Sequence, residues 1–340
     1  MRDKPSRPRT GRKDMNNLTN SKSLELLTKL VREKIDGATG TWEKPFFSNP
    51  KGTPRNVFTK HTYNGFNPFL LGLVSEIKGY EYGAWASYKQ YSDNGVFINK
   101  GERGTPVAFW KIDFVMKDDY TKSVSVEDYR MLTTEEKEKY KERLFLKEYY
   151  LFNVEQTNMR EVKPDMFEKV RKMFSTALEK DETGQFFNQE FDKMVANQSF
   201  ICPIYVKDCG RAYFSRTSVS ITVPSKKLYK DDKQYYSTLA HECAHATMIP
   251  LNRETNGTFG SEKYAREELV AEIASALIGM QLGFSTTIED DNAQYLKSWE
   301  TALNEEDKKS FLFLYNVVKD ATKASELVLN CIQEKDVKVA

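Results

Sequence analysis

Two of the three histidines in the chain stand four residues apart, and a glutamate follows the first, so that residues 241–245 read His-Glu-Cys-Ala-His. This HExxH spacing brings the imidazoles together only on an α-helix, where positions i and i+4 lie about 40° apart around the axis. Two neutral imidazoles placed in this way can bind Zn²⁺, and Glu242 would lie beside the metal-bound water as general base and then general acid. The motif therefore predicts a helix through His241 and His245. Residues 232–248 carry its signals, with N-cap candidates Asp231 and Asp232 at the start and Pro250 soon after the end.

A catalytic zinc site needs a third protein ligand and an open position. The remaining histidine, His61, stands far upstream, so a carboxylate is the expected ligand. A second predicted helix, residues 261–282, carries Glu268 and Glu272 on one stripe. We predict Glu268 as the ligand and Glu272 as an acceptor that orients a histidine N–H. Glu267, about 100° away on the same helix, is the alternative ligand. The competing interpretation is a pair of buried structural histidines beside a solvated acidic helix start.

The charge of the chain is unevenly distributed. Its 340 residues include 51 Lys or Arg and 49 Asp or Glu, and this balance argues against a uniformly basic nucleic-acid binder. Residues 1–60 nevertheless hold 14 basic residues against 6 acidic ones, whereas residues 121–340 hold 31 against 36. A basic N-terminal part beside an acidic C-terminal part indicates different partners for the two, and a basic solubilising tail is the alternative.

The composition predicts a folded protein of a reducing compartment. The hydrophobic fraction of 39% argues against global disorder, and no stretch has the roughly 18 uncharged apolar residues of a membrane helix. The N-terminus is basic and lacks the apolar core of a secretory signal. The four cysteines have no CxxC spacing, which favours free thiols. We therefore expect a cytoplasmic protein with no membrane partner.

The length and pattern predict an α+β fold of two domains. We expect a basic disordered tail over residues 1–20, a mixed α/β domain over 21–158 and a mostly helical domain with a small β-sheet over 159–340. In the first domain the pattern predicts helices at 22–35, 68–78 and 84–91, strands at 96–99, 105–114 and 149–154, and a charged solvated insertion at 117–146. In the second it predicts short strands at 200–206, 211–215 and 219–223, then helices at 232–248, 261–282, 291–303 and onward to about 332.

Three stretches of the C-terminal half resemble the zincin-like domain of ArdC-type antirestriction proteins, which conjugative plasmids and mobile elements encode: HECAHAT (241–247), FGSEKYAREELVAEI (259–273) and AQYLKSWETAL (293–303). The N-terminal half resembles the single-stranded-DNA-binding domain of the same family. Its matching stretches are WEKPF (42–46), PRNVFTKHTYNGFNPFLL (54–71), WASYKQ (85–90), KGERGTPVAFW (100–110) and LFNVEQT (151–157).

This resemblance implies a protein that binds single-stranded DNA non-specifically and helps incoming DNA escape host restriction. It implies a metallopeptidase-like site with one zinc ion per chain, in which His241, His245 and Glu268 are the metal ligands and Glu242 is the catalytic acid/base. Two alternatives stay open. One is a DNA-shielding protein whose metal site is proteolytically silent, and the other is a DNA-activated regulatory protease that cleaves a repressor or a restriction subunit.

Candidate DNA contacts in the N-terminal half are basic, aromatic and amide side chains. A basic groove holds phosphates and aromatic rings stack on bases, so both types in one region fit a single strand. The candidates are Arg55, Lys60, Lys89, Lys100 and Arg103 for phosphates, Tyr63, Trp85 and Tyr88 for stacking, and Asn56, Asn64 and Asn67 as donors. The alternative for each aromatic is core packing, and for each cation an ordinary solvated charge.

Overall fold

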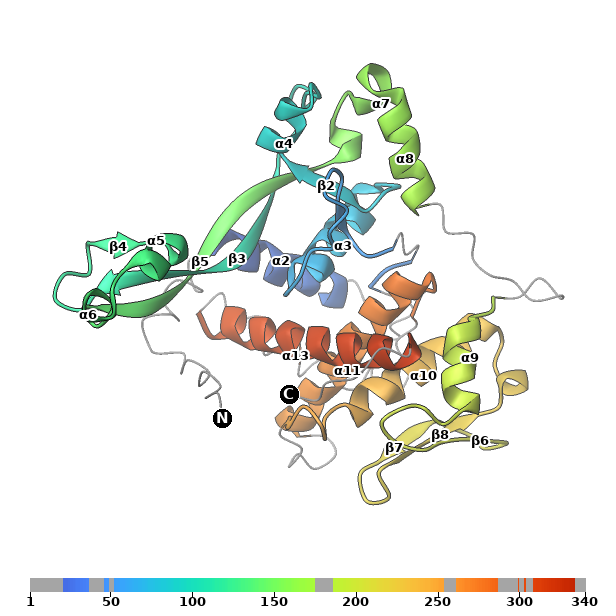
Figure 1. Cartoon of the computed structure of the whole chain (residues 1–340). Coiled ribbons are helices and arrows are strands. Elements are labelled where there is room, and N and C mark those ends of the chain that lie inside the picture. The colour runs from blue at the N-terminus through green and yellow to red at the C-terminus, as the bar shows by residue number, and fades with distance from the viewer. Residues whose placement is uncertain are drawn as a thin grey trace.

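A computed structural model gives the structure of the chain and describes residues 21–36, 46–48, 52–174, 186–253, 261–286, 299, 303 and 308–333. Helices and two separate mixed sheets make up the fold, so the predicted α+β class is confirmed (Figure 1). None of the helices in these ranges combines the length and apolar character needed to cross a bilayer.

The N-terminal part is built on a five-stranded sheet of order β1-β2-β5-β3-β4, in which only β1 and β2 are parallel. Its elements are α2 (Lys22–Asp36), β1 (Arg55–Asn56), α3 (Asn67–Lys78), β2 (Ala84–Ser87), α4 (Tyr88–Asp93), β3 (Thr105–Met116), β4 (Ser123–Val124), α5 (Val126–Met131), α6 (Thr134–Lys137), β5 (Tyr140–Asn153), the 3₁₀ turn η1 (Val154–Gln156), α7 (Met159–Val162) and α8 (Pro164–Phe174).

The C-terminal part joins a three-stranded sheet of order β6-β8-β7 to long helices. Its elements are α9 (Gln189–Ala196), β6 (Ile204–Lys207), β7 (Tyr213–Ser215), β8 (Ser220–Pro224), the 3₁₀ turn η2 (Lys226–Leu228), α10 (Asp232–Ala246), α11 (Glu262–Leu282) and α13 (Lys308–Ile332). The helices α10, α11 and α13 contact one another, and β8 lies against α10.

One hydrophobic core joins the two parts of the chain. It combines Leu24 and Leu27 of α2 with Leu269 of α11 and Val317 of α13, all fully buried. Figure 1 shows α13 running below α2 and α3, with α11 crossing behind it. The site-bearing helices are therefore held against the N-terminal part by continuous apolar packing.

The packing also crosses residue 158, where the sequence placed a domain boundary. Phe167 and Val170 of α8 lie in one buried cluster with Tyr82, Ala84 and Val154 of the N-terminal part. The helix after the predicted boundary thus completes the N-terminal core, because its apolar side chains cover that side of the sheet.

Three predicted elements differ in the structure. The predicted helix 84–91 is a strand, β2, followed by the short helix α4. Ser87 begins α4 with a capping box, because its side chain accepts from the Gln90 amide while Gln90 accepts from the Ser87 amide. The predicted strand 96–99 is reduced to a single bridge between Ile98 and Thr157.

The third difference concerns the charged segment 117–146, which is not a separate insertion. β3 and β5 pair without interruption from Thr105–Leu151 to Met116–Tyr140, so the segment's last residues extend β5. β4, α5 and α6 close the far end of this ribbon, which projects to the left in Figure 1. The predicted tail 1–20 and most of the predicted helix 291–303 lie outside the described residues.

Candidate metal centre

The HExxH helix forms as its sequence signals predict. Asp231 caps the N-terminus of α10, and its side chain accepts from the Gln234 amide at 2.9 Å. α11 begins at the Ser261 cap and ends at Gly283, whose left-handed φ of 87° suits a residue without a Cβ. α10 and α11 pack against each other, so the motif residues of one helix face the carboxylates of the other.

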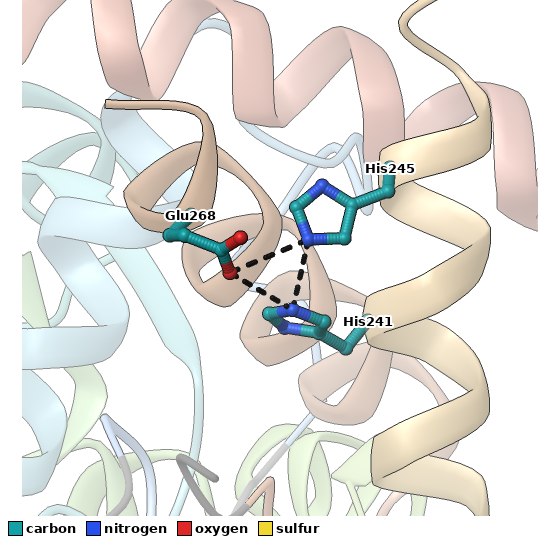
Figure 2. A group of neighbouring side chains, drawn as sticks. All are labelled: His241, His245 and Glu268. Carbon is teal, nitrogen blue, oxygen red and sulfur yellow. Dashed lines mark hydrogen bonds and ion pairs between the residues drawn. The ribbon is translucent and has the colours of Figure 1, made fainter. Parts of the chain in front are cut away.

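Three side chains from these two helices converge on one point. His241 and His245 of α10 project toward Glu268 of α11, and Figure 2 shows all three tips meeting between the helices. The two Nε2 atoms are 3.0 Å apart, and each lies 3.4 Å from Oε2 of Glu268. Among the residues that the structure describes, this is the one group of three or more His, Cys, Asp or Glu side chains arranged to hold a metal ion.

The spacing of these three donor atoms fits a tetrahedral ion. Ligands about 2.0–2.1 Å from a tetrahedral Zn²⁺ lie about 3.3 Å from one another. The observed separations of 3.0, 3.4 and 3.4 Å are close to that value. Two nitrogens and one carboxylate oxygen are also a donor set that zinc accepts, with one position left for water or substrate.

The other nitrogen of each imidazole faces a second carboxylate. Nδ1 of His241 lies 3.5 Å from Oε1 of Glu272, and Nδ1 of His245 lies 3.5 Å from Oε1 of Glu267. A proton held on Nδ1 by a carboxylate leaves the Nε2 lone pair for a metal. Glu272 thus lies where the sequence predicted an orienting acceptor, whereas Glu267, the alternative ligand, faces the far side of the second imidazole.

A buried arginine holds Glu267 in place. Arg253 donates from Nε and Nη2 to the two carboxylate oxygens, at 3.0 and 2.6 Å. It also donates from Nη1 to Oγ1 of Thr247 and from Nη2 to the carbonyl of Ala244, at 2.7 and 2.9 Å. Arg253 and Thr247 were not predicted from the sequence, because a single arginine after a helix carries no local signal of its partner.

The electrostatics of the cluster favour a positive charge at its centre. Burial opposes protonation of His241, but the carboxylates of Glu272 and Glu268 outweigh it and raise the pKa of this imidazole to about 9. Burial is likewise overcome at His245, where Glu268 and Glu267 raise the pKa. Although burial acts in the opposite sense, the two imidazoles hold the pKa of Glu268 well below its usual value. A cation at the convergence point would replace protons that these carboxylates otherwise attract.

Glu242, the predicted acid/base, is a buried carboxylate whose charge acts on this centre. It follows His241 on α10, is 6% exposed, and its charge contributes to the raised pKa of His245. A carboxylate beside a metal-binding position can take a proton from water and pass it on. Cys243, by contrast, is fully buried in the core formed by α10 and β8, away from the convergence point.

The structure separates the candidate DNA contacts into buried and exposed groups. Trp85 is fully buried in the shared core, and its ring meets Tyr80 edge to face, so its prediction as a stacking platform is wrong. The prediction of Asn67 as a DNA contact is also wrong. Asn67 is buried, and its side-chain amide pairs with the N–H and carbonyl of Ala108 in β3. Both residue types are common on surfaces and in cores, so the sequence did not separate the two roles.

Asn56 and Tyr63 have structural roles too. Asn56 is buried, and its side-chain oxygen accepts from the amides of Phe58 and Thr59, which closes a turn. Tyr63 is half-buried and donates to the carbonyl of Trp85 at 3.0 Å. The other candidates lie at the surface, with Arg55 half-exposed and Lys60, Asn64, Tyr88, Lys89, Lys100 and Arg103 exposed.

Two family models match the chain in consecutive segments. Residues 21–152 match the N-terminal domain of the anti-restriction factor ArdC, and residues 190–313 match a zincin-like metallopeptidase domain. The crystal structure of the antirestriction protein ArdC from plasmid R388, in its metal-free form, superposes with a TM-score of 0.67 at 25% identity, covering 93% of this chain and 99% of that one. The chain belongs to the ArdC-type antirestriction proteins.

One further structure and two further proteins are similar to the chain over most of its length. The Mn(II)-bound structure of R388 ArdC superposes with a TM-score of 0.63 at 25% identity, covering 91% of this chain and 97% of that one. The y4eC protein of Sinorhizobium fredii is 27% identical over 84% of this chain and 86% of its own length. The DNA primase TraC of Escherichia coli is 29% identical over 90% of this chain, which spans only 27% of the primase.

Proposed function

We propose that this ArdC-type protein binds single-stranded DNA non-specifically and holds one zinc ion through His241, His245 and Glu268. It would act in the cytoplasm, where DNA entering by conjugation or on a mobile element meets restriction enzymes. The observation that supports metal binding is the spacing of the three donor atoms, which suits a tetrahedral ion. The Mn(II)-bound structure of the R388 relative supports a divalent metal in this family.

The residues around this position suit peptide hydrolysis. A zinc ion bound there supplies a Lewis acid that polarises a carbonyl and lowers the pKa of bound water. The Glu242 carboxylate would accept a proton from that water and return it to the leaving amine nitrogen. Glu267 and Glu272 hold the histidine rings so that their Nε2 atoms point inward. A protein or peptide chain is therefore the substrate class that the site would take.

The exposed basic and aromatic residues of the N-terminal part support DNA binding. Lys60, Lys89, Lys100 and Arg103 are exposed cations, and Tyr88 is 60% exposed. A single strand offers phosphates to such cations and unpaired bases to such rings. These residues remain our candidate contacts, together with Arg55 and Asn64.

The experiment that tests the proposal is protection of incoming DNA. Plasmid transfer into a restricting recipient is measured with the wild-type protein, with Glu242→Gln, with His241→Ala and without the protein. We expect wild type to raise the yield of transconjugants. Glu242→Gln, which keeps the shape of the carboxylate but does not act as a base, should lose that gain. Unchanged protection by both variants would favour a DNA-shielding protein with a proteolytically silent site. If both variants lose protection and wild type alone cleaves one host protein, the regulatory protease is favoured.

A further inference from the structure

The ribbon formed by β3 and β5 presents two chemically different faces. Its strands pair over twelve consecutive residues, from Thr105–Leu151 to Met116–Tyr140, without a bulge. Side chains alternate between the faces of a strand, and this register pairs odd numbers with odd numbers. All odd-numbered residues of the ribbon therefore share one face, which we call the odd face, and all even-numbered residues share the other, the even face.

Positive charge is confined to the odd face. This face carries the cations Lys111, Lys141, Arg143 and Lys147 and a single acid, Asp113. Arg143 already engages that acid, through hydrogen bonds of 2.9 and 2.5 Å. The even face carries the acids Glu142 and Glu148 and no cation. Lysines that served only to solubilise the ribbon would not need to be sorted in this way.

Aromatic rings alternate with these cations on the odd face. Phe109 is the cross-strand partner of Lys147, and Phe145 is the partner of Lys111, so the two kinds of side chain form a checkerboard. Tyr149 follows on the same face and is 37% exposed, while the two phenylalanines are half-buried.

The rings are held in fixed positions by their neighbours. Phe109 and Tyr149 meet edge to face with ring centroids 5.7 Å apart. Nζ of Lys147 lies 5.3 Å from the centre of the Tyr149 ring, and the guanidinium of Arg143 lies 5.5 Å from that of Phe145. Ordered rings lose little conformational freedom when a flat partner stacks on them.

We propose that the odd face of the β3–β5 ribbon is a binding surface for single-stranded DNA. The cations Lys111 and Lys147 contact phosphates, and the rings of Phe145 and Tyr149 stack with unpaired bases. A duplex keeps its bases stacked on one another and offers this surface only its backbone, so the surface selects single strands. The inference rests on the proposed DNA-binding function, and it gives that function a location outside the candidate residues predicted from the sequence.

The first arm of the test compares two neighbouring tyrosines on opposite faces. Binding of a labelled oligothymidylate to the full chain is followed by fluorescence anisotropy for wild type, Tyr149→Ala and Tyr150→Ala. Tyr150 is 47% exposed on the even face and is the matched control. Loss of one stacking ring weakens binding by about 5- to 140-fold. We expect a loss in this range for Tyr149→Ala and wild-type affinity for Tyr150→Ala.

The second arm measures salt dependence. For a single strand, log affinity falls as log salt rises, and the magnitude of this negative slope decreases by about 0.7 for each phosphate contact that is lost. The double variant Lys111→Gln/Lys147→Gln should therefore decrease the magnitude of the slope by about 1.4, whereas Glu142→Gln on the even face should not decrease it. Far-UV circular dichroism checks that the variants keep the ribbon.

The outcomes separate this inference from the proposed function. If wild type does not bind the oligonucleotide, the proposed DNA-binding function itself is wrong. If wild type binds, and Tyr149→Ala and the double lysine variant bind equally well with an unchanged slope, DNA binding stands and the odd face is not its surface. Equal losses for Tyr149→Ala and Tyr150→Ala would also overturn the assignment to one face.

Discussion

Replacing Arg253 tests whether a buried ion pair supports the candidate metal centre. The Arg253 and Glu267 side chains are 4% and 5% exposed, and two hydrogen bonds of 3.0 and 2.6 Å join them. Arg253→Met keeps an unbranched apolar stem but leaves the Glu267 carboxylate buried without its arginine partner. The oxygen atoms of Thr247 and Ala244 lose a donor at the same time.

The expected cost follows from this burial. Removing one partner of a buried, hydrogen-bonded ion pair costs about 3–5 kcal/mol of unfolding free energy, because the remaining charge stays uncompensated. An exposed pair contributes about 0–1 kcal/mol. Lys227→Met is the matched control, since Lys227 pairs with Asp208 at 2.7 Å while both side chains are more than half exposed.

Urea unfolding of the full chain, followed by circular dichroism in excess chelator, measures the two costs. The chelator removes the stabilisation that bound metal would add. The double variant Arg253→Met/Glu267→Gln, which removes both charges, should recover about 0.5–3 kcal/mol of the loss. In the metal-loaded protein, Arg253→Met should also weaken metal affinity by about 10- to 100-fold, because Glu267 no longer orients His245. If Arg253→Met lowers the unfolding free energy by less than about 1 kcal/mol, as Lys227→Met is expected to do, the Arg253–Glu267 pair does not stabilise the fold as a buried ion pair.

Three further predictions concern packing and protons. Gly279→Ala should lower the unfolding free energy by about 1–3 kcal/mol, because an added Cβ would lie 2.5 Å from the carbonyl oxygen of Phe284. Gly210→Ala, with open space around the added Cβ, should change the unfolding free energy little, and urea midpoints compare the two variants. Trp85→Ala should cost about 3–5 kcal/mol in the same assay, because the ring is fully buried. Metal affinity should rise by at least about tenfold per pH unit between pH 6 and 8, because the raised pKa values of His241, about 9, and of His245 leave protons for the metal to displace. Chelator competition measures this, and a flat profile would contradict it.

The helical part of the site was predictable because its signals are local. The i, i+4 spacing of His241 and His245 and the caps of both helices lie within short stretches of sequence, and α10 and α11 form where these stretches predict them. The convergence of Glu268 with the two histidines needed only that two adjacent helices pack. Local periodicity was therefore sufficient for the elements that carry the site.

What the sequence analysis missed depends on contacts between distant residues. The pairing of Arg253 with Glu267 spans a segment between two helices, and no local pattern specifies it. The burial of Trp85 follows from its place between β1 and β5, which is a property of the sheet rather than of the WASYKQ stretch. One error was avoidable, because Ser87 and Gln90 have the spacing of a capping box and mark where α4 begins.

We propose that three side chains of α10 and α11 hold a metal ion, and the zinc content of the purified protein is the direct test. Zinc is measured by mass spectrometry in the purified full chain and in the variants His241→Ala, Glu268→Ala and Glu242→Gln. We predict one zinc ion per chain in wild type and in Glu242→Gln, and loss of the ion in the other two, because a bound metal needs all three protein ligands. Full zinc occupancy in both His241→Ala and Glu268→Ala would contradict the account.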